Sequence, residues 1–337
     1  MPEPTTTTTP ATSDPADPPN SAKAASTADG TPAPSGAPSE REFTIAERSQ
    51  VQLVFRRFLQ HRLAVVSLVV LLALVLLAYI GGALWKYGYE EFTPDNSAAP
   101  SLEHPFGTAS DGKDLFAQVL RGTQISLQIA VLVAIFSTVF GTLWGAVAGY
   151  FGGLVDSILM RITDLVLTLP LIAVAAMLGH GAENSEWSLL RNAGWALIAV
   201  VIASLYWAYV SRVARGVVLS LREKEFIEAA RALGSGHWRI ILRHLVPNAL
   251  GSIIVNATIL ISVAILLETA LSYLGFGVKA PDTSLGLLVS SAQSALSTRP
   301  WLFYFPGLFI IIIALCINFI GDGLRDALDP QQTKVRR

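Results

Sequence analysis

The stretch that organises this chain is EFIEAARALGSGHWRIILRHLVPN, residues 225–248, a polar segment between two long apolar runs. Its first part predicts a short helix with an apolar face of Phe226, Ala229, Ala230 and Leu233. Gly234 follows where a helix commonly ends in a left-handed residue. A second short helix should run from an N-cap at Ser235 to Pro247, with an apolar stripe of Trp238, Ile241, Leu242 and Leu245. Residues 222–248 should therefore form an L-shaped projection, which we call the knob.

The composition of the chain assigns the knob to a membrane protein. Of the 337 residues, 52% are hydrophobic and only 15% are charged, which is too little charge for a soluble chain of this size. Cys316 is the only cysteine, so the sequence excludes an intramolecular disulfide and a zinc cluster. No motif indicates a cofactor, a metal ion or a nucleic-acid partner, and we expect none of the three.

Six apolar runs predict the fold class, an all-α polytopic membrane protein with six transmembrane helices. The first run is Leu63–Ile80, and we extend the first transmembrane helix to residues 63–84. Arg56, Arg57 and Arg62 precede it, and by the positive-inside rule they place the N-terminus in the cytoplasm. An even number of spans then places both termini there. The other runs lie near residues 125–149, 157–178, 194–216, 249–273 and 301–321.

The segments between the runs differ in composition and charge. Residues 1–44 form a Thr/Pro/Ala-rich tail that should be disordered, and residues 45–62 predict an interfacial helix against the inner leaflet. Residues 85–121 should form an extracytoplasmic loop, because Lys86–Phe116 holds six acids and two bases. The knob is basic, since Arg212–Arg243 holds seven bases and three acids, and this favours the cytoplasm. Residues 323–337 should form a cytoplasmic C-terminus.

Three glycines on the second apolar run predict close helix packing. Gly141, Gly145 and Gly149 recur every fourth residue, which lets the backbone of another helix approach this one. The other helix could belong to this chain or to a second subunit. We keep both alternatives.

Two acidic residues in the apolar runs are candidates for either structure or gating. Asp164 lies three residues after Arg161 on a helix, so the two are expected to pair near the inner surface. Glu268 lies nineteen residues after Ala249, about 28 Å further along a helix and so near the outer interface. It could satisfy neighbouring polar groups or line an outer gate.

One apparent catalytic motif lacks a residue that its chemistry needs. Residues 107–113, GTASDGK, match the spacing of a phosphate-binding loop, but Asp114 stands where Ser or Thr should ligate magnesium. No parallel-strand pattern precedes the segment, and neither a zinc-protease motif nor a nucleophile elbow occurs in the chain. We therefore expect no catalytic residues and no enzymatic activity.

The knob resembles the cytoplasmic coupling loop of a known family, the integral-membrane permease subunits of ABC importers. The matching residues are Glu228-Ala229-Ala230, Gly234, Ile241-Leu242 and the segment 245–248, LVPN. Other segments resemble the C-type subunit of dipeptide and oligopeptide transporters: HPFGT at 104–108, GTQISL at 122–127, GYFGG at 149–153, LSYLGFG at 271–277 and NFIGDGLRDALDP at 318–330. Ala109, Lys113 and Gln124 depart from the usual Asp, Arg and Arg of that pattern.

This resemblance implies a type I ABC importer permease fold, with residues 122–322 forming a five-helix permease core. It implies a heteromeric assembly with a second homologous permease, two ABC ATPases and an extracytoplasmic binding protein, in a bacterial cytoplasmic membrane. ATP hydrolysis is then expected on the partner ATPases, and the cargo is expected to be a peptide. Nickel, glutathione or another small solute is an alternative cargo, and a non-transporting membrane scaffold is an alternative of another class. The residues expected to couple to the ATPases are Glu228, Ala229, Ala230, Arg231, Gly234, Trp238 and Pro247.

Overall fold

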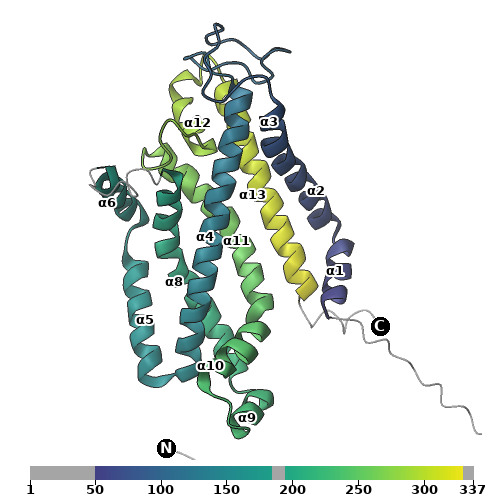
Figure 1. Ribbon diagram of the computed structural model, residues 1–337, viewed down its shortest axis with the longest axis vertical. Coiled ribbons are helices and arrows are strands. Elements are labelled where there is room, and N and C mark those ends of the chain that lie inside the picture. The colour runs from purple at the N-terminus through teal and green to yellow at the C-terminus, as the bar shows by residue number, and fades with distance from the viewer. Residues whose placement is uncertain (1–49, 184–193, 329–337) are drawn as a thin grey trace, which may run out of the picture. The chain divides into compact units, whose positions relative to one another are not determined.

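The chain forms a bundle of long helices in a computed structural model, which describes residues 50–183 and 194–328 (Figure 1). Within those ranges the regular structure is helical, apart from two isolated β-bridges in the loop before residue 115. The predicted tail, residues 1–44, lies outside the described residues, as do the last residues of the predicted C-terminus, 329–337.

The first half of the bundle begins with α1 (Gln50–Gln60), which α2 (Arg62–Leu76) follows after a break at His61. The same span continues through a π-helical turn (Leu77–Gly81) into α3 (Gly82–Leu84). The next helix, α4 (Leu115–Phe151), is central, with α8 and α5 on one side of it and α13 and α2 on the other (Figure 1). A pair of shorter helices follows, α5 (Gly153–Thr168) and α6 (Leu171–Glu183).

The second half begins with α8 (Trp195–Leu221), after which the knob folds as α9 (Glu225–Ala232) and α10 (His237–Ile240). A π-helical turn (Ile241–Leu245) leads directly into α11 (Val246–Tyr273). A short helix, α12 (Leu285–Ser291), and a 3-10 turn (Gln293–Ala295) cover one end of the bundle before the last long helix, α13 (Trp301–Leu328). In Figure 1 α12 and the knob lie at opposite ends of the bundle.

Within residues 50–183 and 194–328, five helical segments are long and apolar enough to cross a membrane, and α5 with α6 makes a sixth span only if the bent pair counts as one. The predicted span near residues 157–178 corresponds to this pair, and its axis bends by 79° between α5 and α6. The cause is Pro170, which disfavours the helical conformation of the residue before it. Leu169 is accordingly extended, with φ −73° and ψ 126°.

The expected loop over residues 85–121 is shorter than predicted. The loop ends at Asp114, whose side chain accepts a hydrogen bond from the backbone N–H of Ala117 and so starts α4 at Leu115. Residues 115–121 are therefore helical, and α4 has 37 residues. At about 1.5 Å per residue it is about 55 Å long and extends beyond the hydrocarbon core of a bilayer.

The three spaced glycines of α4 all face α8 of the same chain. A Cβ atom on Gly141 would lie 2.5 Å from the carbonyl oxygen of Trp207, and one on Gly149 would lie 3.0 Å from a methyl carbon of Val218. Gly145, between them, faces the backbone of Ser211 and Arg215. Because no larger residue fits in these positions, the glycines set the distance between the axes of α4 and α8.

Candidate functional site

The knob is fixed to the bundle by a small hydrophobic cluster beneath α9 and α10. Ile227 and Ala230 of α9 are buried there, together with Ile240, Ile241 and Leu245, against the ends of α4 and α8 at Ala146, Tyr150 and Val218. Of the four residues of the predicted apolar face of α9, Ala230 is buried against the bundle, and Phe226, Ala229 and Leu233 are exposed. Ile227 is the buried residue that the sequence reading missed.

The first bend of the knob is a Schellman motif. Gly234 has φ +78°, its N–H donates to the carbonyl of Arg231, and the N–H of Ser235 donates to the carbonyl of Ala230. The prediction of Ser235 as the N-cap of the second helix is wrong, since Gly236 occupies that position. The left-handed residue was predicted at the position where it occurs.

The second helix of the knob does not end at Pro247. Residues His237–Tyr273 form one helical segment of 37 residues, in which Pro247 stands in the first turn of α11, directly after the π-helical turn. Proline has no N–H to donate to the preceding turn, and a π turn changes the backbone pairing there. Pro247 is therefore accommodated inside a continuous helix, and the predicted helix end at this residue is wrong.

A polar contact also joins the knob to α4. The hydroxyl of Tyr150 lies 2.9 Å from Nδ1 of His237, and the guanidinium of Arg231 lies over the Tyr150 ring at 5.3 Å from its centroid. Nη1 of Arg222 donates to the carbonyl of Gly149 at 3.0 Å. The end of α4 thus holds the beginning and the bend of the knob.

The outward surface of the knob combines apolar side chains with charges. Leu233 is 86% exposed and Trp238 is 61% exposed. Phe226, in the first turn of α9, is exposed as well. Of the residues predicted to couple, Ala230 is buried, and the rest are exposed: Glu228, Ala229, Arg231, Gly234, Trp238 and Pro247. An exposed set of large apolar residues with adjacent charges is suited to binding another protein.

Asp164 lies on α5 and ties that helix to α8. Nη2 of Arg212 donates to the carboxylate of Asp164 at 2.7 Å. The prediction that Asp164 pairs with Arg161 is therefore wrong. Arg212, 48 positions later in the sequence, approaches Asp164 because α5 and α8 pack side by side. A second pair, Arg215 with Asp156, joins the same two helices.

Glu268 is fully buried between α4, α11 and α12, at the end of the bundle opposite the knob. Ser272 donates to one carboxylate oxygen at 2.7 Å, and Ser126 of α4 donates to the other at 2.9 Å. The N–H of Leu285, at the start of α12, donates to Ser126 Oγ at 3.3 Å. A carboxylate in the bundle interior is thereby hydrogen-bonded on both oxygens.

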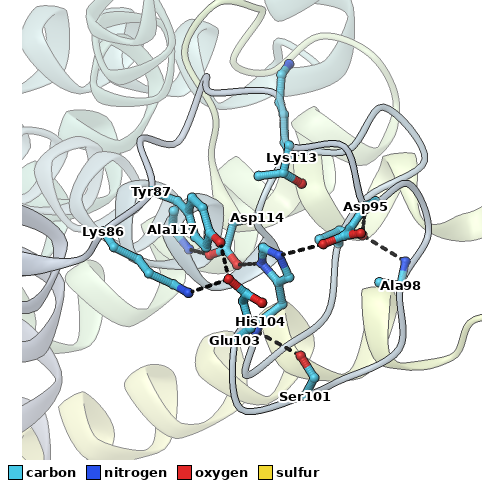
Figure 2. A network of polar contacts seen from close by, with 12 residues as sticks. Lys86, Tyr87, Asp95, Ala98, Ser101, Glu103, His104, Lys113, Asp114 and Ala117 are labelled. Atoms are coloured by element: carbon cyan, nitrogen blue, oxygen red, sulfur yellow. Dashed lines mark hydrogen bonds and ion pairs between the residues drawn. The ribbon is translucent and has the colours of Figure 1, made fainter.

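The loop before α4 contains a polar network centred on a buried histidine (Figure 2). His104 is 2% exposed, its Nδ1 lies 2.7 Å from Oδ2 of Asp114, and its Nε2 lies 3.7 Å from Asp95. Asp114 also accepts from the Trp85 indole at 3.1 Å. Asp114, which stands at the magnesium-ligand position of the apparent phosphate-binding loop, is therefore the buried N-cap of α4.

At the edge of this network Glu103 accepts hydrogen bonds from Tyr87 at 2.8 Å and from Lys86 at 3.0 Å (Figure 2). The hydrogen bond from Tyr87, followed by that from Lys86, holds the pKa of the Glu103 carboxyl below its usual value. The ring of Tyr87 stacks on His104 with centroids 4.8 Å apart. The loop is therefore a folded cap joined to α4.

Helices long and apolar enough to cross a membrane, with a helical knob between α8 and α11, define the class of a multi-pass membrane protein. The chain belongs to the family of binding-protein-dependent transport system inner membrane components, whose sequence profile matches residues 141–334. The profile of the N-terminal TM domain of oligopeptide transport permease C matches residues 49–105.

Relatives are similar along most of their length. The oligopeptide transport system permease protein OppC of Mycobacterium tuberculosis H37Rv is 42% identical over 292 residues, 86% of this chain and 97% of that protein. OppC of Escherichia coli K12 is 41% identical over 288 residues, which are 84% of this chain and 92% of that protein. The dipeptide transport system permease protein DppC of Alkalihalophilus pseudofirmus is 38% identical over 306 residues, 89% and 96% of the two chains.

A solved structure shares the fold. The inward-facing MetNI methionine ABC transporter aligns with a TM-score of 0.51 at 18% identity, over 63% of this chain and 96% of that chain. At that identity the likeness concerns the fold alone. The predicted type I ABC importer permease fold is confirmed.

Proposed function

We propose that this chain is the C-type permease subunit of an ATP-driven ABC importer for dipeptides and oligopeptides. The observation that carries the proposal is the similarity, at 38–42% identity over most of the chain, to permeases named for dipeptide and oligopeptide transport. In this assembly the chain forms half of the translocation pathway beside a second homologous permease. Two ABC ATPases and an extracytoplasmic binding protein complete the importer.

The knob is the surface to which an ATPase binds in this proposal. Its exposed residues Phe226, Leu233 and Trp238 would enter a cleft of the ATPase, and Glu228 would meet a basic or amide group there. The basic balance of Arg212–Arg243 supports a cytoplasmic knob, and an even number of spans then places both termini in the cytoplasm. Motion of the ATPases would reach the spans through α8 and α11, which flank the knob.

The coupling role is tested by Glu228→Lys and Leu233→Asp in cells that lack the native subunit. Both side chains point away from the bundle, so the variants should insert at normal abundance while peptide uptake is lost. Asp111→Lys makes the same charge change as Glu228→Lys in the loop before α4, where Asp111 pairs only with Lys113 among the described contacts, and it should keep uptake. Normal peptide uptake by both knob variants would show that the knob does not couple the chain to an ATPase.

The cargo is tested separately, by competition uptake assays with dipeptides, tripeptides and longer peptides against a labelled peptide. Competition that depends on this subunit supports peptide import. Uptake of nickel, glutathione or another small solute, with no effect of peptides, would show that the cargo is that solute and not a peptide. The permease role would be unaffected. A chain that purifies without a second permease or an ATPase, in cells that hold their genes, would favour a non-transporting scaffold.

A further inference from the structure

The first helix of the described chain has one face fixed to the end of α13. Phe58 is buried in a cluster with Ala64 and Ala327. A Cβ on Gly323 would lie 3.3 Å from the Phe58 ring, so a glycine allows this close contact. Nε2 of His61 lies 3.6 Å from the carboxylate of Asp326. These contacts define the orientation of α1 about its own axis.

The other faces of α1 carry exposed apolar residues together with arginines. Phe55 is 62% exposed and Leu59, one turn later, is 50% exposed. Arg56 follows Phe55 directly and is exposed, and Arg62, at the start of α2, is exposed as well. Apolar side chains and cations alternating on one surface are typical of helices at a membrane interface.

The depth of α1 follows from the length of the span beside it. Arg62–Leu84 has 23 residues, or about 34 Å of helix, which is enough to cross a hydrocarbon core of about 30 Å. The preceding helix therefore lies at the level of the lipid headgroups. Phe55 and Leu59 can enter the acyl boundary from there, while Arg56 and Arg62 stay among the phosphates.

The charges around α1 favour an anionic occupant. The charged residues of 50–85 are Arg56, Arg57 and Arg62, with no lysine, aspartate or glutamate. The acids of the neighbouring α13 end are Asp326, which faces His61, and Asp322, one turn before it, with Arg325 between them in sequence. Neither Arg56 nor Arg62 forms an ion pair with another described residue, and both exposed side chains remain available to a headgroup.

We propose that the exposed face of α1, formed by Phe55, Arg56, Leu59 and Arg62, binds the headgroup of an acidic phospholipid. The arginines supply charge-assisted hydrogen bonds to the phosphate, and the apolar pair supplies contact with the acyl chains. The site depends on the membrane-spanning fold alone, so it stands or falls independently of the transported solute.

The test uses the full-length chain in nanodiscs of phosphatidylcholine containing a small fraction of spin-labelled phosphatidylglycerol or spin-labelled phosphatidylcholine. The immobilised fraction of each label reports lipid bound to the protein. The unchanged chain should prefer phosphatidylglycerol, and Arg56→Gln with Arg62→Gln should reduce the preference by about fivefold per arginine. Arg239→Gln, an exposed arginine on α10, is the matched control and should not change it.

Three results would overturn the proposal. The first is equal immobilisation of both labels by the unchanged chain. The second is an unaltered preference in the double variant with its thermal unfolding unchanged. The third is a preference that emerges only after deletion of residues 1–44, which would show that the chain's own tail occupies this face. Loss of the preference in 0.5 M salt, with the immobilised phosphatidylcholine unchanged, would support an electrostatic headgroup contact.

Discussion

Ser126 on α4 donates a hydrogen bond to Glu268 on α11, 142 positions later in the chain, at 2.9 Å. The same hydroxyl oxygen accepts from the N–H of Leu285 at the start of α12. One buried carboxylate and one serine therefore join three helices at the end of the bundle away from the knob. Such a network stabilises the fold only while each member has its partners.

Replacing Glu268 by alanine should destabilise the protein, because it removes the acceptor for Ser126 and Ser272 and leaves a cavity. An unsatisfied buried hydroxyl costs about 1–3 kcal/mol. Glu268→Gln keeps the size of the side chain and one acceptor oxygen, so it should lose much less stability than Glu268→Ala. Thermal unfolding in nanodiscs measures both variants. Equal unfolding temperatures for the unchanged chain and Glu268→Ala would contradict the structural role.

Replacing Gly145 by alanine should separate α4 from α8, because the added methyl group would meet the backbone of Ser211 and Arg215. Overpacking of this kind typically costs about 1–3 kcal/mol. Gly216 on α8 is the matched control, since a Cβ there meets no atom within 4 Å. Gly216→Ala should be neutral or slightly stabilising, as alanine favours helix. Unfolding temperature and membrane abundance report the difference, and equal values for the two variants would exclude the packing role.

Replacing Asp114 by alanine should loosen the cap before α4, because three donors lose their acceptor: His104 Nδ1, the Trp85 indole and the Ala117 N–H. Loss of an N-cap alone costs about 1 kcal/mol. Hydrogen exchange over residues 85–118 should rise. Asp111→Ala is the control, since Asp111 is exposed and pairs with Lys113. Equal exchange in the two variants would show that the network does not hold the loop.

Replacing Tyr150 by phenylalanine should loosen the knob without unfolding the bundle. The ring stays in its hydrophobic cluster, and only the hydrogen bond with His237 is lost, worth about 0.5–1.5 kcal/mol. Hydrogen exchange over α9 and α10 should increase while exchange in α13 does not. Tyr209→Phe, at an exposed position of α8, should change neither. Unchanged exchange in α9 after Tyr150→Phe would mean that the apolar cluster and the other contacts with α4 hold the knob without this hydrogen bond.

The sequence predicted the features that depend on local composition. Apolar runs indicate the spans, because hydrocarbon requires about 20 apolar residues per helix. Gly234 was placed correctly because a left-handed helix end strongly favours glycine. In the bend of α5 and α6, Pro170 was visible in the sequence, but its effect depends on whether neighbouring helices support a kink or a turn.

Long-range pairing could not be read from the sequence. Asp164 has Arg161 one turn away, and only the packing of α5 against α8 brings Arg212 closer. The buried side of α9 likewise depends on where α4 and α8 end, and this selects Ile227 and leaves Leu233 outside. Pro247 suggested a helix end because the preceding π-helical turn has no recognisable sequence signal.

The continuity of His237–Tyr273 has a mechanical consequence. A rod of 37 residues, about 55 Å long, connects the knob at one end of the molecule with Glu268 near the other end. A force applied at Trp238 travels along peptide bonds and helical hydrogen bonds, and no sliding interface interrupts it. Helices bend mainly at prolines and π-helical turns, so we expect any bending of this rod at the turn before Pro247, where it would reduce the part of a push that reaches the far end.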